Sequence, residues 1–206
     1  PPPPPPPPLL LLFFFSSNLF QNPKNIPWWS RLGVGSSDAA FLLKSLNERF
    51  AFGLNNVQLE ELAGRIGSDC PFFIKNNPCL VTGRGENLEN IHLSLKGYYM
   101  VLICPGIQVS TAAAYSEIIP SQRSPGLREM VQHDIYKWRD QIKNQFEVPV
   151  FRKHPLLKVI KEELYSIGAE YASMTGSGSA IFGLFRSVPE IPGQFKDYFI
   201  FREWLS

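Results

Sequence analysis

A glycine-rich turn followed at once by helix-forming residues stands at Leu32-Gly33-Val34-Gly35-Ser36-Ser37-Asp38-Ala39-Ala40. The first turn of a helix leaves backbone N–H groups unpaired, and the helix dipole adds partial positive charge at the same end. Glycines allow that backbone to approach an oxyanion without a Cβ in the way. The stretch therefore predicts a phosphate-binding loop. The alternative is a Gly-Ser turn that only caps an ordinary helix.

The spacing of this loop excludes two common phosphate-binding motifs. No Gly-Lys-Ser/Thr closes it, as a Walker A loop would require, and the third glycine of a Rossmann fingerprint is absent.

Composition agrees with a globular domain, because 44% of the 206 residues are hydrophobic and 18% are charged. The net charge of +2 indicates neither a nucleic-acid nor a membrane partner. Cys70, Cys79 and Cys104 have no C-x-x-C spacing, which predicts reduced thiols in a cytoplasmic protein. The three histidines share no spacing with one another or with acidic residues, so we expect no histidine metal site.

The first 17 residues are eight prolines, four leucines, three phenylalanines and two serines, in that order. The apolar run within them is too short to span a bilayer, and no positive charge precedes it as in a signal peptide. Pyrimidine-only codons can encode all four residue types, so we interpret the block as a translated C/T tract. A disordered proline-rich tail is the alternative. Either way, we expect residues 1–21 to be a low-complexity tail outside the fold.

Helical periodicity after the glycine-rich turn predicts one helix face directed inward, formed by Ala39, Leu43, Leu46 and Phe50. A second helix is expected after an Asn56 cap and before Gly67, with an inward face of Leu59, Leu62, Ala63 and Ile66. Strands are expected at residues 71–74 and 80–82.

The second half of the chain predicts one fully buried strand at residues 98–104, because this apolar run is bounded by glycine and proline. Helices are expected at 112–118 (capped by Ser110 or Thr111), through 127–146, and from Pro155 to Gly168. Further strands are expected at 171–174, 180–185 and 198–201. Helices and strands alternate without a regular βαβ period, so the predicted class is α+β.

Three features carry candidate chemistry. Asp69 lies between a helix end and Pro71, where it can act as a general base or only accept local hydrogen bonds, and its neighbour Cys70 is expected only to pack. Residues 175–179, Thr-Gly-Ser-Gly-Ser, form either a second ligand-binding loop or a flexible hairpin. Tyr115 either stacks on a base or packs against the core.

The spacing Pro27-x-x-x-x-Leu-Gly-x-Gly-Ser-Ser resembles the phosphate-binding motif of the GHMP kinases, a family that includes galactokinase and the homoserine and mevalonate kinases. Further segments resemble the same family in the same order: residues 24–27, 67–73, 81–86, 105–111 and 174–183. Several motifs in the same order as in the family are far more specific than a single motif. The resemblance covers about residues 22–203.

The resemblance implies a two-lobed α+β fold, with residues 22–93 as the remainder of an incomplete N-terminal, ATP-binding lobe and residues 97–206 as the C-terminal lobe. It implies an ATP-dependent kinase that phosphorylates the 2-hydroxyl of a cytidine diphosphate methylerythritol, in non-mevalonate isoprenoid biosynthesis. Its partners would be small molecules, and it would be a cytoplasmic monomer or homodimer without nucleic acid or membrane contacts.

The resemblance also assigns site residues. Asp69 matches the position of the family's catalytic aspartate, Thr111 and Tyr115 would bind the substrate, and Mg²⁺ would contact Ser36 or Ser37. ATP would be bound by Pro27, Leu32, Gly33, Val34, Gly35, Ser36, Ser37, Gly176, Ser177 and Gly178.

The chain departs from the family pattern before the glycine-rich turn. Trp29-Ser30-Arg31 stands where the family has Gly-Ala-Gly, which a short frameshift would explain and a true divergence would explain equally. The family's N-terminal lysine has no counterpart, since Lys24 lies too close to the turn. We therefore expect the chain as it stands to be inactive and to fold poorly. The alternatives are a GHMP kinase for another small alcohol, or an inactive remnant that binds nucleotide or a partner.

Overall fold

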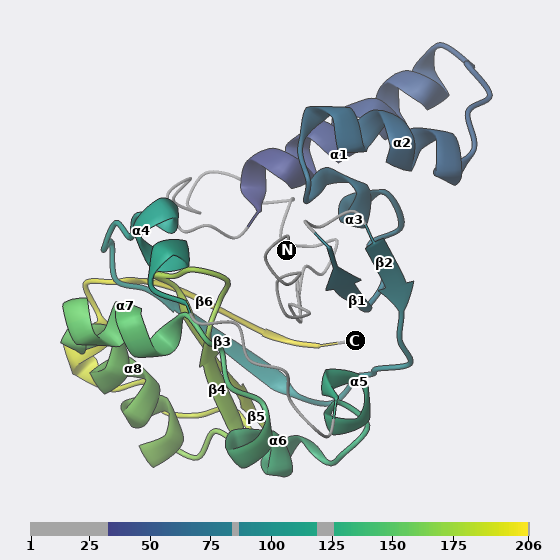
Figure 1. The fold of residues 1–206 in the computed structure, drawn as a ribbon. Coiled ribbons are helices and arrows are strands. Elements are labelled where there is room, and N and C mark those ends of the chain that lie inside the picture. The colour runs from purple at the N-terminus through teal and green to yellow at the C-terminus, as the bar shows by residue number, and fades with distance from the viewer. Residues whose placement is uncertain (1–32, 84–86, 119–125, 206) are drawn as a thin grey trace. The chain divides into compact units, whose positions relative to one another are not determined.

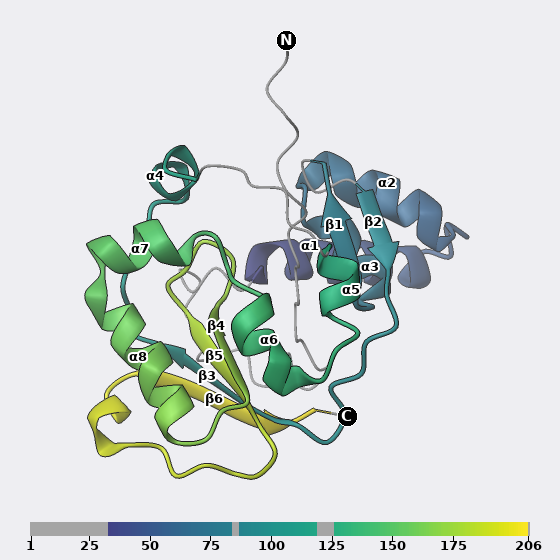
Figure 2. The same ribbon diagram turned by 60° about the horizontal axis from the view of Figure 1, so that its bottom comes forward.

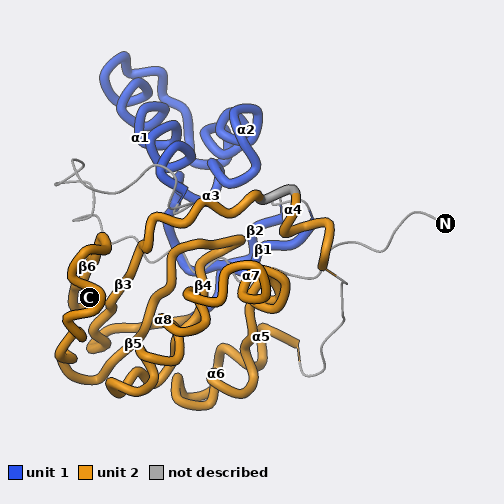
Figure 3. The backbone as a smooth tube through the Cα atoms, turned by 90° about the vertical axis from the view of Figure 1, so that its left-hand side faces the viewer, with its two compact units in different colours: residues 1–15, 33–92, 120–122 blue, residues 16–32, 93–119, 123–206 orange. Residues whose placement is uncertain are grey.

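The structure is a computed structural model of the chain and describes residues 33–83, 87–118 and 126–205. These residues fall into two compact units, residues 33–92 and the remainder (Figures 1 and 3). The low-complexity block, Pro27, Leu32 and the Trp29-Ser30-Arg31 segment lie outside the described residues. No helix among the described residues is long and apolar enough to cross a membrane.

The first unit contains three helices and a two-stranded antiparallel sheet: α1 (Val34–Arg49), α2 (Asn56–Ile66), α3 (Cys70–Lys75), β1 (Cys79–Thr82) and β2 (Asn87–Asn90). Its core gathers apolar side chains from α1, α2, α3 and β1. The helix α2 begins one residue earlier than predicted, because Asn55 rather than Asn56 is its cap. Asn55 and Gln58 form a reciprocal capping box, which satisfies two backbone donors.

The inward face predicted for α1 is partly wrong. Ala40 is fully buried and Leu43 is half-buried, whereas Leu46 and Phe50 are 38% and 62% exposed. The small Ala40 side chain lies in the core that α1 shares with α2 and α3, and Leu43 packs against that core. The face predicted for α2 is also only partly right, since Leu59 and Ala63 are buried but Ile66 is exposed.

The strand predicted at residues 71–74 is wrong, because these residues form the helix α3 (Figure 1). A short apolar run does not distinguish a strand from a buried helix by periodicity. Pro71 stands in the first turn, where its fixed φ favours a helix and its missing N–H costs nothing. The helix ends at Asn76, which adopts the left-handed conformation with φ 52°. The predicted strand at 80–82 is confirmed as β1, and its partner β2 was not predicted.

The second unit is built around a four-stranded antiparallel sheet in the order β4-β5-β3-β6. The strands are β3 (Tyr99–Cys104), β4 (Tyr171–Met174), β5 (Ile181–Phe185) and β6 (Phe199–Trp204), and a 3₁₀ turn, η3 (Gly193–Phe195), precedes the last one. All six residues of β3 are buried, as expected for a strand with a neighbour on each side. The four strands predicted in this half of the chain, and the α+β class, are confirmed.

The helices of the second unit are α4 (Thr111–Ser116), α5 (Leu127–Met130), α6 (Ile135–Gln141), α7 (Glu147–Lys153) and α8 (Pro155–Ser166). The helix α8 packs against β4 and β5, and α6 packs against β4 (Figure 2). The helix predicted from Pro155 is confirmed as α8, but its inward face of Leu156, Leu157, Ile160 and Leu164 is only partly right, because Leu156 is 40% exposed. The other three are completely buried, and truncation of such residues costs about 2–5 kcal/mol each. The prediction of continuous helix through 127–146 is wrong, because α5 and α6 are separate and 142–146 is not helical.

Candidate functional site

The first candidate site lies at the start of α1. Gly33 is the N-cap and has φ 70°, a left-handed conformation that glycine adopts at no steric cost. The Ser37 N–H donates to the Gly33 carbonyl at 2.8 Å, which closes the first turn. The N–H groups of Val34, Gly35 and Ser36 precede that bond and have no intrahelical acceptor. This backbone is suited to an anion because three donors and the positive end of a 16-residue helix coincide.

The space beside Gly35 in this turn is open. Gly35 is exposed and helical, and a Cβ placed on it would meet no atom within 4 Å. Gly35 is therefore not required by its own backbone conformation, in contrast to Gly33. Ser37 is buried and its hydroxyl donates to the Val34 carbonyl at 2.8 Å. The Ser36 side chain is half-buried, so Ser36 is the better placed of the two predicted oxygen ligands.

Asp69 lies at the N-terminus of α3 and its carboxylate makes no capping hydrogen bond. The residue is exposed. The neighbouring atoms nevertheless desolvate the carboxylate enough to raise its pKa above the usual 3.8. Cys70 is buried and packs into the core, as predicted. Asp69 is therefore exposed, and its carboxylate does not cap the helix α3.

The second glycine-rich loop joins β4 to β5 in the second unit. It is a constrained turn, in which the Thr175 N–H donates to Ala180 at 2.9 Å and the Gly178 N–H donates to Thr175 at 2.8 Å. Gly176 and Gly178 have φ values of 47° and 91°. These bonds and conformations argue against the alternative of a flexible hairpin.

The predicted substrate residues Thr111 and Tyr115 both lie on α4. Ser110 caps this helix, since its hydroxyl accepts from the Ala113 N–H at 3.3 Å. Tyr115 packs edge to face against Phe146, with ring centroids 4.8 Å apart, and is 52% exposed. Packing, one of the two roles left open by the sequence, is therefore confirmed for one part of the residue, and another part is exposed.

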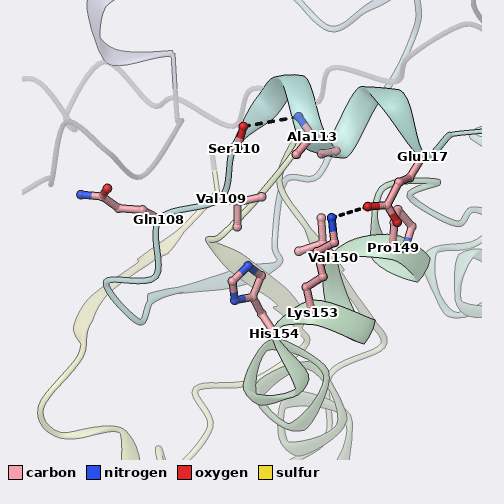
Figure 4. Close-up of a pocket in the computed structure, with 10 residues that line it drawn as sticks. Gln108, Val109, Ser110, Ala113, Glu117, Pro149, Val150, Lys153 and His154 are labelled. Carbon is pink, nitrogen blue, oxygen red and sulfur yellow. Dashed lines mark hydrogen bonds and ion pairs between the residues drawn. The ribbon is translucent and has the colours of Figure 1, made fainter.

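A cavity of about 200 Å³ lies between α4, α7 and the segment before α4 (Figure 4). At one side of it, Glu117 is paired with Arg152 at 2.8 Å and with Lys153. The hydrogen bond from Lys153 lowers the pKa of Glu117. Tyr115 is not among the residues that line this cavity, although Ser110 and Ala113 of the same segment are.

Sequence reasoning missed two polar residues behind the second glycine-rich loop. Asn144 donates to the carbonyls of Met174 and Gly176, and the buried carboxylate of Glu147 accepts from the Met174 N–H. The available signal was a single charged residue inside the apolar run 146–151. Among the described residues, no group of three or more His, Cys, Asp or Glu side chains is arranged to hold a metal ion.

Comparison with known proteins identifies the family. Residues 127–199 match the family model described as GHMP kinases C terminal. A 4-diphosphocytidyl-2-C-methyl-D-erythritol kinase from Parabacteroides distasonis is 43% identical over 180 residues, which cover 87% of this chain and 65% of the relative. A kinase of the same name from Bacteroides fragilis is 48% identical over 162 residues, covering 79% of this chain and 59% of the relative.

Solved structures agree. A crystal structure of 4-(cytidine 5'-diphospho)-2C-methyl-D-erythritol kinase superposes with a TM-score of 0.67 at 32% identity, covering 78% of this chain and 59% of that one. A homoserine kinase from Cytophaga hutchinsonii has a TM-score of 0.53 at 14% identity, covering 89% and 68%, and supports the fold alone. The chain thus belongs to the GHMP kinases. Within that family it is related to the 4-diphosphocytidyl-2-C-methyl-D-erythritol kinases, and it spans about three fifths of the length of the curated relatives it matches.

Proposed function

We propose that the protein containing this chain is an ATP-dependent kinase that phosphorylates the 2-hydroxyl of 4-diphosphocytidyl-2-C-methyl-D-erythritol. The observation that carries the proposal is the 43% identity to a relative of that name over 87% of the chain, a span that includes both glycine-rich loops and Asp69. We further propose that residues 22–93 and 97–206 belong to the two lobes of this kinase, and that it acts in the cytoplasm on small molecules alone.

The first unit would hold the triphosphate and the base. The N–H groups of Val34, Gly35 and Ser36 suit phosphate oxygens, since the space beside Gly35 is open. Pro27 and Leu32 are assigned to the same ATP site by the resemblance. No carboxylate cluster among the described residues offers Mg²⁺ a site of its own, so a bound Mg²⁺ would rest on phosphate oxygens and the Ser36 hydroxyl, and would neutralise phosphate charge.

Asp69 would accept the proton of the attacking hydroxyl. That hydroxyl oxygen forms a bond to the γ-phosphorus, the bond from this phosphorus to the β–γ bridging oxygen breaks, and ADP leaves. The role suits a carboxylate that is exposed and makes no capping bond. Desolvation raises the pKa of Asp69, which makes its carboxylate a stronger base.

The second unit would supply the remaining contacts. Gly176, Ser177 and Gly178 would lie along the nucleotide phosphates, and Thr111 and Tyr115 would bind the cytidine substrate. The exposed part of the Tyr115 ring offers a face for stacking on cytosine, while Phe146 fixes its position.

The test is turnover by the full-length protein with ATP, Mg²⁺ and each of two acceptors, the cytidine diphosphate methylerythritol and homoserine. We expect ADP release only with the former, and a new phosphomonoester by ³¹P NMR. Turnover with homoserine alone would favour a GHMP kinase for another small alcohol. Nucleotide binding without turnover would favour the alternative of an inactive remnant that only binds nucleotide.

A further inference from the structure

The turn between β4 and β5 is fixed by side chains from a segment that precedes it by about 30 residues. The Asn144 Nδ2 atom donates to two carbonyl oxygens, those of Met174 and Gly176, each at 2.8 Å. The Phe146 N–H donates to the Asn144 Oδ1 atom at 2.9 Å. This last bond orients the amide, because only the oxygen can accept it, and so directs the amide nitrogen at the turn.

Glu147 also binds the backbone of Met174, but at its N–H group rather than at its carbonyl. The residue is only 7% exposed. Its Oε1 atom accepts from the Met174 N–H at 2.9 Å and from the Ser173 hydroxyl at 3.2 Å, and its Oε2 atom is 2.6 Å from Lys161 Nζ. A buried carboxylate is costly unless it is paired and hydrogen-bonded, and Glu147 meets both conditions.

Met174 is therefore fixed at both of its backbone groups. Glu147 binds its N–H and Asn144 binds its C=O, immediately before the loop begins. The Met174 side chain in turn occupies the space beside Gly178. The entry and the middle of the turn are thus determined by Asn144 and Glu147 as well as by the strand ladder.

This arrangement has a consequence for anion binding. Carbonyl oxygens carry partial negative charge and repel a phosphate, whereas N–H groups attract it. The peptide plane is rigid, so a carbonyl that is held toward Asn144 cannot rotate toward the opposite side of the turn. Asn144 keeps two carbonyls on its own side in this way.

We propose that Asn144 and Glu147 are positioning residues for the nucleotide phosphates, because they hold the Thr175–Ser179 turn in a conformation that withdraws the carbonyls of Met174 and Gly176. The inference rests on the proposed function, in which Gly176–Gly178 contact ATP. Neither residue touches the substrates in this role. Both act through the backbone of Met174 and Gly176.

The experiment compares three variants of the full-length protein with a matched control. Asn144→Ala removes the donor. Asn144→Asp keeps the shape and the acceptor for the Phe146 N–H but places a carboxylate against two carbonyls. Glu147→Gln keeps the shape and removes the charge that pairs with Lys161.

Glu170→Gln is the control because Glu170 makes similar bonds just before the opposite end of β4. It accepts from the Tyr98 hydroxyl at 2.7 Å and pairs with Arg186 at 3.3 Å. Loss of carboxylate hydrogen bonds at this position should lower stability slightly without reaching the turn.

We expect the KM for ATP to rise about tenfold in Asn144→Ala, because two hydrogen bonds are lost, and further in Asn144→Asp, because repulsion replaces them. Glu147→Gln should raise it severalfold. The KM for the alcohol substrate should stay within twofold in all three, and Glu170→Gln should leave both constants unchanged. Equal rises for both substrates, or no rise for ATP in Asn144→Asp, would overturn the inference.

Calorimetric binding of ATP and a thermal melt accompany each variant. If the wild-type protein binds ATP but transfers no phosphate to the cytidine substrate, the proposed function fails, and the ATP affinities of the variants still decide the positioning role. If the wild-type protein binds no ATP, both proposals fail. Glu147→Gln and the nearly isosteric Asn144→Asp keep the test decisive if Asn144→Ala does not fold.

Discussion

The Met174 side chain occupies the space that a side chain on Gly178 would need, since a Cβ on Gly178 would lie 2.7 Å from the Met174 sulfur. Gly178 also has φ 91°, which L-residues rarely adopt. The glycine is therefore required by sterics as well as by backbone conformation, whatever the loop binds.

Gly178→Ala should accordingly destabilise the protein by about 1–3 kcal/mol, because it combines overpacking with a strained φ. Gly193→Ala is the control, since a Cβ there meets no atom within 4 Å and its φ is not positive. Urea unfolding of both variants checks the prediction. If the two variants have the same midpoint, the close approach of Met174 and Gly178 does not constrain the turn.

The ion pair between Lys161 and Glu147 should contribute far more than the pairs on the surface. Lys161→Met leaves a buried carboxylate without its cation and should cost about 3–5 kcal/mol. Lys158→Met, on the same helix, breaks a pair at 3.5 Å whose two side chains are largely exposed, and should cost about 0.5 kcal/mol or less. Chemical denaturation of both variants measures the difference, and similar losses would contradict the burial argument.

The elements predicted correctly from the sequence are those that bury a whole strand or one face of a helix. The strand at 99–104 and the helix from Pro155 are of this kind, because a single apolar run or stripe specifies each. The strand predicted at residues 71–74 is wrong because Phe72, Phe73 and Ile74 form a short buried apolar run, whose periodicity does not distinguish a strand from a helix. Asn144 and Glu147 were missed for another reason. Their partners in β4 and the turn after it lie 26 to 32 residues away in the chain, and local periodicity carries no information about such contacts.

Asp69→Asn should reduce kcat of the full-length enzyme by roughly 10²–10⁴-fold, the usual range for removal of a general base. Because Asp69 is exposed and makes no capping bond, the thermal midpoint should barely change. Turnover within a few-fold of the wild type would give Asp69 a structural role only.

The pH dependence of the wild-type enzyme tests the same residue. The base acts in its ionised form, so activity should fall as the pH falls through the Asp69 pKa, and that acid limb should lie above pH 3.8 because desolvation raises this pKa. A raised pKa means that the folded state binds the proton more tightly than the unfolded state. Asp69 therefore disfavours folding slightly above its folded pKa, and this effect disappears as the pH falls. An acid limb that is unchanged in Asp69→Asn would belong to another group.

Gly35→Val separates a phosphate-binding role for the first loop from a purely structural one. Gly35 lies within α1 with helical backbone and open space where a Cβ would stand, so valine should fold there with little change in melting temperature. That same space is where the phosphate should lie, so the added methyl groups should weaken ATP binding by tenfold or more while the cytidine substrate is affected less. Gly33→Val is the contrasting variant, because its φ of 70° is strained for any β-branched residue and should lower the melting temperature. Calorimetric titration of each ligand into the full-length protein, with a thermal melt, measures these effects. Equal losses for both ligands in Gly35→Val, or no loss for ATP, would remove this loop from the nucleotide site.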